Sequence, residues 1–248
     1  MDPRERLILA LDVDTLEHAV RLVRATAPYV GAYKVGLELV NAEGPAALDY
    51  LHECGAKRIF YDAKFHDIPA TVHRAVRAAI RHNLWMLNVH AAGGSRMVTA
   101  AAQAIHEHTS RIAAHAERPL LVGVTLLTSM NDTELQNDLM VSVDRYTYVS
   151  RLARMVQLCG GQGVVASAWE IEAVRRTCGP DFVIVTPGVR PEGTDPADQR
   201  RTVTPAEAIR RGADYLVLGR PITGAPDPAA AARRVLEEIS AEMGRMET

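Results

Sequence analysis

Short apolar runs alternate with helical segments along the entire chain, and this alternation constrains the fold more than any other feature. Eight runs rich in Val, Ile and Leu lack a strict polar–apolar alternation, as is typical of strands buried on both faces of a parallel sheet. They span residues 7–11, 32–35, 58–61, 86–89, 120–124, 163–166, 182–185 and 215–218. Helical periodicity falls between them, over residues 16–27, 70–82, 97–108, 146–158, 169–177, 205–211 and 229–243. The sequence therefore predicts an α/β protein built from β-then-α units.

A polar residue or a glycine stands at the end of nearly every predicted strand. These residues are Asp12, Lys34, Asp62, His90, Thr125, Ser167, Thr186 and Gly219. In an open doubly wound sheet a ligand binds at one switch point, whereas in a closed barrel all the carboxyl ends surround one site. The spread of polar ends, and a length of 248 residues against roughly 250 for such barrels, predict a (β/α)8 TIM barrel. We expect a single domain over residues 1–248, with its active site at the carboxyl ends of the strands.

Composition and charge exclude several classes of function. A net charge of −2 lacks the basic footprint of a general nucleic-acid binder, and no apolar run approaches the roughly 20 residues that span a membrane. The three cysteines form no C-x-x-C pair, which argues against a disulfide framework. The apolar run at 7–11 is too short for a secretory signal. We expect a cytoplasmic protein that binds neither nucleic acid nor membranes.

The segment after the third predicted strand concentrates charge. Asp62 and Lys64 are two residues apart, so in a strand they point to the same side, and Lys34 belongs to the neighbouring strand. A carboxylate held between ammonium groups keeps its charge when it is partly buried. Such a cluster can deliver a proton or stabilise a carbanion. The same residues would also fit a buried ion-pair network that only orders the barrel.

Glycine and arginine follow the last two predicted strands. Arg190 ends the segment Thr-Pro-Gly-Val-Arg, and Gly219 directly precedes Arg220. Barrel phosphate sites are commonly built from the loops after these two strands. Glycine lets backbone N–H groups approach a phosphate, and arginine adds a fork of donors. We expect a phosphate site here, and the polar stretch 191–203 is long enough to form a lid over it. A second long irregular stretch is expected at 127–144.

An ordered set of motifs resembles the orotidine 5'-monophosphate decarboxylase family. The signature D-A-K-F-H-D-I-P-A-T occupies residues 62–71. Six further segments match in order and spacing: L-A-L-D at 9–12, K-V-G at 34–36, N-V-H-A at 88–91, T-L-L-T-S-M at 125–130, T-P-G-V-R at 186–190 and G-R-P at 219–221. The resemblance covers about residues 7–240, and no motif position departs from it.

This resemblance implies a reaction and its central residues. The substrate is orotidine 5'-monophosphate, the products are uridine 5'-monophosphate and carbon dioxide, and no cofactor or metal takes part. Lys64 protonates C6 as the carboxylate leaves, and Asp62 lies beside that carboxylate. Lys34 bridges Asp62 and the ribose hydroxyls, and Asp12 also contacts the ribose.

The resemblance also implies the remaining binding groups and the assembly. Asp67, Ile68 and Thr71 reach into the active site of a partner subunit, which makes the active unit a homodimer. The phosphate is bound by Arg190, Gln199, Gly219 and Arg220. Thr128 contacts the pyrimidine ring, although from its position alone it fits a turn or cap residue equally well.

Three other functions remain to be weighed against this one. Magnesium-dependent sugar-phosphate decarboxylases and aldolases of the same superfamily share D-x-K-x-x-D, but they have a glutamate metal ligand where this chain has Lys34. An ammonium group cannot ligate magnesium, whose ligands are oxygens. A Schiff-base role for Lys64 needs a neutral amine, and the neighbouring carboxylates of Asp62 and Asp67 are expected to favour the charged ammonium. A non-catalytic nucleotide-binding barrel would need the phosphate site but not the charged cluster.

Overall fold

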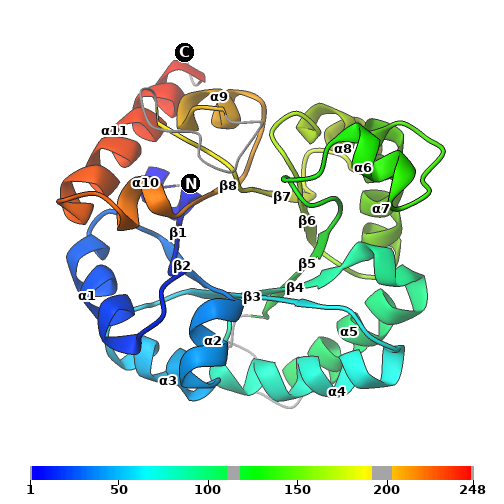
Figure 1. Cartoon of the computed structure of the whole chain (residues 1–248), viewed down its shortest axis with the longest axis horizontal. Helices are drawn as coiled ribbons and strands as arrows, with labels where there is room; N and C mark the ends of the chain where they lie inside the picture. Colours follow the sequence, from blue (N-terminus) through cyan, green and yellow to red (C-terminus); the bar gives the residue numbers. More distant parts are fainter. Residues whose placement is uncertain (1, 111–117, 192–202, 247–248) are drawn as a thin grey trace.

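Eight parallel strands close into a barrel, as the alternating pattern predicts. The computed structural model describes residues 2–110, 118–191 and 203–246. The strands are β1 (Leu7–Ala10), β2 (Ala32–Val35), β3 (Ile59–Phe65), β4 (Met86–His90), β5 (Leu120–Val124), β6 (Gly163–Val165), β7 (Val183–Thr186) and β8 (Tyr215–Leu218). Each strand pairs with the next along the chain, and β1 pairs with β8 to complete the ring. Figure 1 looks along this ring and shows the helices outside it.

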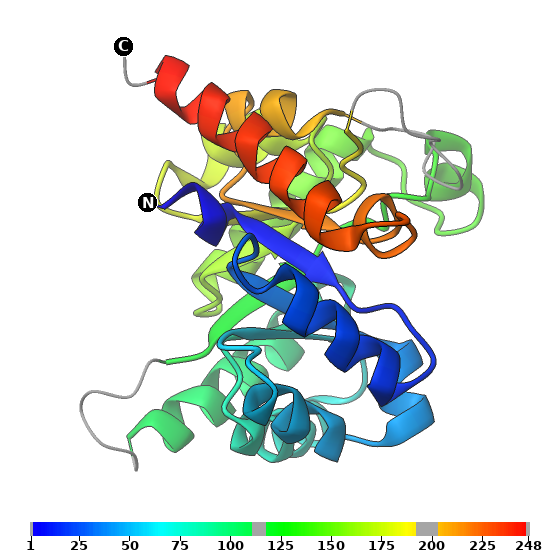
Figure 2. The same ribbon diagram turned by 90° about the vertical axis from the view of Figure 1, so that its left-hand side faces the viewer.

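The helices form the outer layer. They are α1 (Leu16–Thr26), α2 (Leu37–Glu43), α3 (Ala46–Glu53), α4 (Pro69–Ala79), α5 (Gly94–Thr109), α6 (Asp132–Asn137), α7 (Arg145–Leu158), α8 (Ile171–Cys178), α9 (Pro205–Arg210), α10 (Arg220–Thr223) and α11 (Pro228–Met246). Short 3₁₀ helices, η1 (Pro3–Arg6), η2 (Ile80–His82) and η3 (Ala91–Gly93), complete the described elements. The last helix, α11, packs against both α1 and η1, so it lies beside the N-terminal segment (Figure 2). Among the described residues, no helix is both long and apolar enough to cross a membrane.

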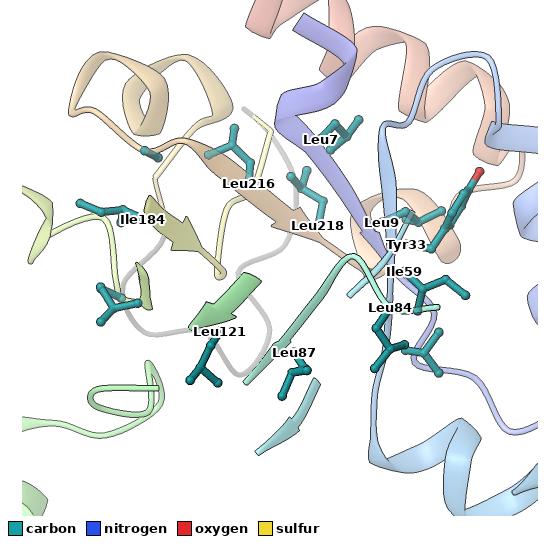
Figure 3. Packing of buried hydrophobic residues seen from close by; sticks show 14 of the residues in the cluster. Leu7, Leu9, Tyr33, Ile59, Leu84, Leu87, Leu121, Ile184, Leu216 and Leu218 are labelled. Carbon is teal, nitrogen blue, oxygen red and sulfur yellow. The ribbon is translucent and has the colours of Figure 1, made fainter. Parts of the chain in front are cut away.

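Alternate strand residues divide the core into two parts. One set, which includes Ile8, Phe60 and Met86, forms a cluster of strand residues alone and fills the barrel interior. The other set packs outward against the helices and makes the larger cluster. Leu7 and Leu9 of β1 and Leu216 and Leu218 of β8 belong to the outward set (Figure 3). Burial on both sides explains why the strands read as continuous apolar runs.

Helices α9 and α11 both begin where the sequence has a capping residue followed by proline. The Thr204 side chain accepts a hydrogen bond from the Glu207 N–H at 3.1 Å, and Asp227 accepts one from the Ala230 N–H at 3.0 Å. Each cap satisfies a donor that the first helical turn leaves unpaired, and proline fits the first helical position. These caps fix where α9 and α11 begin.

The structure corrects three expectations of local structure. The stretch 127–144 is not wholly irregular, because α6 lies within it behind a capping box formed by Asn131 and Glu134. Two short helices, α2 and α3, occupy residues 37–53, where no helix was predicted; Gly44, with φ of 79°, separates them. Such short helices complete too few turns to show a clear hydrophobic period. Strand β3 runs to Phe65, past the predicted end at 61. The predicted strand was too short because the charged residues after 61 are typical of a loop.

Candidate active site

A cavity of about 440 Å³ opens at the carboxyl ends of the strands. Most of the site residues predicted from the sequence line it, namely Asp12, Lys34, Asp62, Lys64, Thr128, Arg190, Gly219 and Arg220. A wider groove of about 690 Å³ lies outside the barrel, along α7 and α8, but its described lining holds arginines and no carboxylate. Of these two, judged by their described lining residues, only the cavity at the barrel mouth brings together charges of both signs.

Strand register explains why the charged side chains point into this cavity. Lys34 is paired with Phe60 of β3 and with Ala10 of β1, and both of these residues belong to the interior cluster. Lys34 therefore takes an inward position within β2 itself, one residue before the strand ends. Asp62 follows Phe60 by two residues and points the same way.

Four charged residues form a continuous chain of contacts. The Lys34 ammonium lies 2.8 Å from Asp12 Oδ1 and 3.2 Å from Asp62 Oδ2. The Lys64 ammonium lies 2.7 Å from Asp62 Oδ1. Asn88 donates from its amide nitrogen to the same oxygen at 2.6 Å. Positive and negative groups thus alternate from Asp12 to Lys64, and the Asp62 side chain, only 10 % exposed, is enclosed by three donors.

Mutual attraction keeps the buried members of this chain ionised. Burial on its own raises the pKa of Asp62, but the Lys34 and Lys64 ammonium groups outweigh burial and lower this pKa below its ordinary value. Burial likewise lowers the pKa of Lys34, and the carboxylates of Asp62 and Asp12 reverse that shift and raise it. Both groups therefore stay charged at neutral pH in a place with little water.

The Lys64 backbone departs from a regular strand. Its φ is 49°, in the left-handed region that non-glycine residues rarely adopt. The pairing of β3 with β4 shifts between Tyr61 and Phe65, so the intervening residues bulge toward the mouth. The expected contact between Asp62 and Lys64 is present, but simple two-residue alternation does not produce it. The bulge turns the lysine back toward the carboxylate.

Two arginines, Arg190 after β7 and Arg220 after β8, also line the cavity. Arg190 follows β7 and is buried, and its pKa is lowered by burial and by the nearby charge of Arg220 after β8. Two like charges held near each other favour binding of an anion between them. Gly219 precedes Arg220 at the start of α10. A Cβ atom added to Gly219 would lie 3.5 Å from the Cβ of Ala10, which is an ordinary van der Waals contact. Gln199 and the interior of the predicted lid, 192–202, lie outside the described residues.

Asp67, Ile68 and Thr71 do not line the cavity of their own chain. Asp67 Oδ1 accepts a hydrogen bond from the Ile68 N–H at 2.6 Å, just before α4. Ile68 is 65 % exposed and presents a large apolar residue to solvent. Asp67 is also exposed and Thr71 is half-buried, so these three residues form an edge at the start of α4.

Two histidines, His66 and His90, lie outside the cavity lining, and His90 is close enough to Lys64 to feel its charge. The rings of His66 and His90 lie 5.4 Å apart. Burial lowers the pKa of His90, and the charges of His66 and Lys64 lower it further. His90 is therefore neutral at neutral pH and lies within the field of the Lys64 ammonium.

Sequence reasoning assigned no role to the buried polar residues Asn88, Arg145 and Glu170. Asn88 lies inside β4 and is fully buried, and it entered the sequence analysis only as the first residue of the N-V-H-A motif. Its position two residues after the inward-facing Met86 was the available signal. Arg145 and Glu170 stabilise the loops after β5 and β6: Arg145 binds Asp132 at 2.6 Å, and Glu170 accepts a hydrogen bond from the Ser167 N–H at 2.9 Å. Arg145 and Asp132 are 13 residues apart, so no local pattern marks their contact. Ser167 and Glu170 are only three residues apart, but the sequence does not show that Glu170 is buried.

The fold and the charged mouth together define a barrel enzyme. The chain belongs to the Orotidine 5'-phosphate decarboxylase / HUMPS family, whose model matches residues 5–235. It is 50 % identical over 239 residues to the orotidine 5'-phosphate decarboxylase of Moorella thermoacetica, covering 96 % of this chain and 94 % of that protein. The enzyme of the same name from Syntrophomonas wolfei is 44 % identical over 240 residues, covering 96 % of this chain and 99 % of the relative.

Solved structures agree with this assignment. The crystal structure of orotidine 5'-phosphate decarboxylase from Lactobacillus acidophilus matches with a TM-score of 0.81 and 34 % identity, covering 94 % of this chain and 98 % of that one. An uncharacterized conserved protein from Geobacillus kaustophilus matches with a TM-score of 0.79 and 35 % identity, covering 94 % and 99 %.

Glu170 makes stability depend on pH. Burial raises its pKa to about 7, so the folded protein keeps this proton at pH values where the unfolded chain, with a value near 4.5, has lost it. Stability therefore falls as the pH rises from about 4.5 to about 7. We predict that Glu170→Gln raises the free energy of unfolding relative to wild type by on the order of 3 kcal/mol at about pH 8, and by little at about pH 5.

Urea denaturation at the two pH values measures this effect. Glu172→Gln, on the exposed face of α8 with its side chain 82 % exposed, is the matched control and should change stability little at either pH. An equal effect of Glu170→Gln at both pH values would contradict the prediction.

Proposed function

We propose that this chain decarboxylates orotidine 5'-monophosphate to uridine 5'-monophosphate and carbon dioxide, the last step of de novo UMP synthesis. The observation that carries the proposal is the alternating chain of Asp12, Lys34, Asp62 and Lys64 at the barrel mouth. Full-length similarity to relatives that bear the name of this enzyme supports it. The cytoplasmic location expected from the sequence belongs to the same proposal.

The chemistry requires stabilisation of charge at one carbon. The bond between C6 and the carboxylate breaks, carbon dioxide leaves, and the electron pair stays on C6. A proton from the Lys64 ammonium then forms the new C6–H bond, and the neutral amine regains a proton from water. An ammonium fixed beside the developing carbanion stabilises it without reorganising solvent. Each tenfold increase in rate needs about 1.4 kcal/mol of such selective stabilisation.

The other charged groups orient the substrate. Asp62 lies beside the departing carboxylate and fixes the direction of the Lys64 ammonium. Lys34 connects Asp62 with the ribose hydroxyls, and Asp12 binds the ribose. Because Lys34 contacts two carboxylates, an ammonium fills the place where a magnesium enzyme of this superfamily would need oxygen ligands. This contact is what favours a metal-free reaction over a magnesium-dependent sugar-phosphate reaction.

The far side of the cavity binds the phosphate. Arg190, Arg220 and the backbone of Gly219 supply donors, with Gln199 from the 191–203 segment, and Thr128 contacts the pyrimidine. Binding energy from the non-reacting phosphate can be spent on ordering the site around C6. The like charges of Arg190 and Arg220 support this assignment, because an anion between them relieves their repulsion.

The active unit is a homodimer with two shared sites. Asp67, Ile68 and Thr71 of each subunit complete the cavity of the other. What supports this is that they lie outside their own cavity and that Ile68 exposes a large apolar side chain. A two-fold assembly would cover this edge on both subunits at once.

Turnover should be independent of divalent metal and should require Lys64. We predict that wild type treated with EDTA consumes orotidine 5'-monophosphate, followed as a loss of ultraviolet absorbance. Lys64→Ala should lower kcat by on the order of 100- to 10,000-fold, the usual contribution of a positioned proton donor. Lys57→Ala, an exposed lysine two residues before β3, should leave the rate unchanged. Activity on a sugar phosphate that returns only with magnesium would instead indicate the other branch of the superfamily.

Mixing two inactive variants tests the shared sites. In a heterodimer of Lys64→Ala and Asp67→Ala, one site receives an intact Lys64 and the partner's intact Asp67. Random reassociation of equal amounts should therefore restore about a quarter of wild-type activity. Steady-state assays before and after subunit exchange measure the recovery. Activity that stays at the sum of the two parents would contradict a site shared between subunits.

A further inference from the structure

Asn88 connects the two residues at the centre of the charged chain. It lies on β4 and is fully buried. Its amide nitrogen donates to Asp62 Oδ1 at 2.6 Å, and its amide oxygen accepts from the backbone N–H of Lys64 at 2.7 Å. One side chain therefore holds both the carboxylate and the backbone of the lysine whose ammonium contacts that carboxylate.

The bulge in β3 depends on this contact. Where β3 shifts register against β4, the Lys64 N–H donates to the Asn88 side chain. An N–H withdrawn from water and left without an acceptor would destabilise this turn. The left-handed backbone of Lys64 adds strain at the same residue. The Asn88 amide compensates for both, because its oxygen lies where the turned backbone presents its donor.

We infer that Asn88 is a positioning residue for the proton donor. It sets the Lys64 backbone in the turned conformation and fixes the Asp62 carboxylate, so that the 2.7 Å contact between Lys64 Nζ and Asp62 Oδ1 has one geometry. Asn88 itself does not line the cavity. The inference rests on the proposed decarboxylase function, because it concerns the step in which Lys64 acts. A misplacement of about 1 Å at a reacting group can lower a rate by about 100-fold.

Asn88→Ala and Asn88→Asp separate this role from simple packing. Asn88→Ala removes both hydrogen bonds and should lower kcat by about 100-fold, while KM changes little because the phosphate and ribose contacts remain. Asn88→Asp has nearly the same shape. When protonated, its carboxyl group donates to Asp62 and accepts from Lys64 as the amide does.

The pH profile of Asn88→Asp gives the sharpest readout. Two carboxylates in contact cannot both ionise easily, so the pKa of the pair is raised. The ratio of kcat in Asn88→Asp to kcat in wild type should therefore be highest at about pH 5.5 and fall at least tenfold by about pH 9, as the second carboxyl group ionises and repels Asp62. If an ionised carboxylate at position 88 did not disturb Asp62 and Lys64, the ratio would not change with pH.

The control is a buried polar residue away from the site. Thr26 lies at the end of α1, where its hydroxyl contacts Tyr33 at 3.2 Å. Thr26→Val should keep the wild-type kcat at every pH, and thermal melts of all variants report folding. If Asn88→Ala does not fold, the profile of Asn88→Asp still decides, because the protonated form restores both hydrogen bonds.

Each outcome has one meaning. A wild type that releases no carbon dioxide contradicts the proposed function, and this inference fails with it. An active wild type with Asn88→Ala within a few-fold of its kcat, or with a flat ratio for Asn88→Asp, contradicts this inference and leaves the proposed function intact. The pH-dependent ratio, with kcat lowered and KM preserved in Asn88→Ala, supports it.

Discussion

The Asp62 carboxylate held between two ammonium groups is the interaction on which the rest of the site depends. A buried carboxylate without partners would take up a proton, and a buried lysine would lose one. Here Lys34 from β2 and Lys64 from β3 keep it ionised, and Asn88 from β4 adds a third donor. These groups meet because neighbouring parallel strands bring successive inward positions to one level. Closure of the barrel therefore creates the charged chain as well as the core.

The site concentrates features that lower the stability of the fold. Lys64 adopts a left-handed backbone, Arg190 and Arg220 repel each other, and Glu170 is buried at the start of α8, after β6. The buried hydrophobic residues of the barrel interior and of the outer layer carry no charge. Their packing stabilises the fold and offsets the destabilising features of the mouth. Strain and like charges at a mouth of this kind are expected where geometry serves a reaction.

The sequence predicted the barrel and most of the charged chain, because both depend on local order. Apolar runs gave the strands within a few residues, and Asp62 and Lys64 stood out as charges beside a strand. Asn88 did not stand out in this way, because the function of a polar residue inside a buried strand becomes clear only when the residues of the neighbouring strand are known. The bulge at Lys64 also depends on residues that come together across the fold, because its N–H binds Asn88 of β4. The cavity residue Gln199 lies outside the described part of the chain, so its role stays a prediction.

An NMR titration of the Asp62 carboxyl group tests directly whether the two lysine charges keep it ionised. Aspartate labelled with ¹³C at its side-chain carboxyl gives an NMR signal that moves when the group takes up a proton, and Asp62→Asn identifies the signal. Because the Lys34 and Lys64 charges outweigh burial, we expect the Asp62 signal to stay that of a carboxylate as the pH is lowered to the ordinary aspartate pKa of 3.8. A signal that titrates at or above that value would show that burial prevails, and would contradict a charged chain held together by its own attraction.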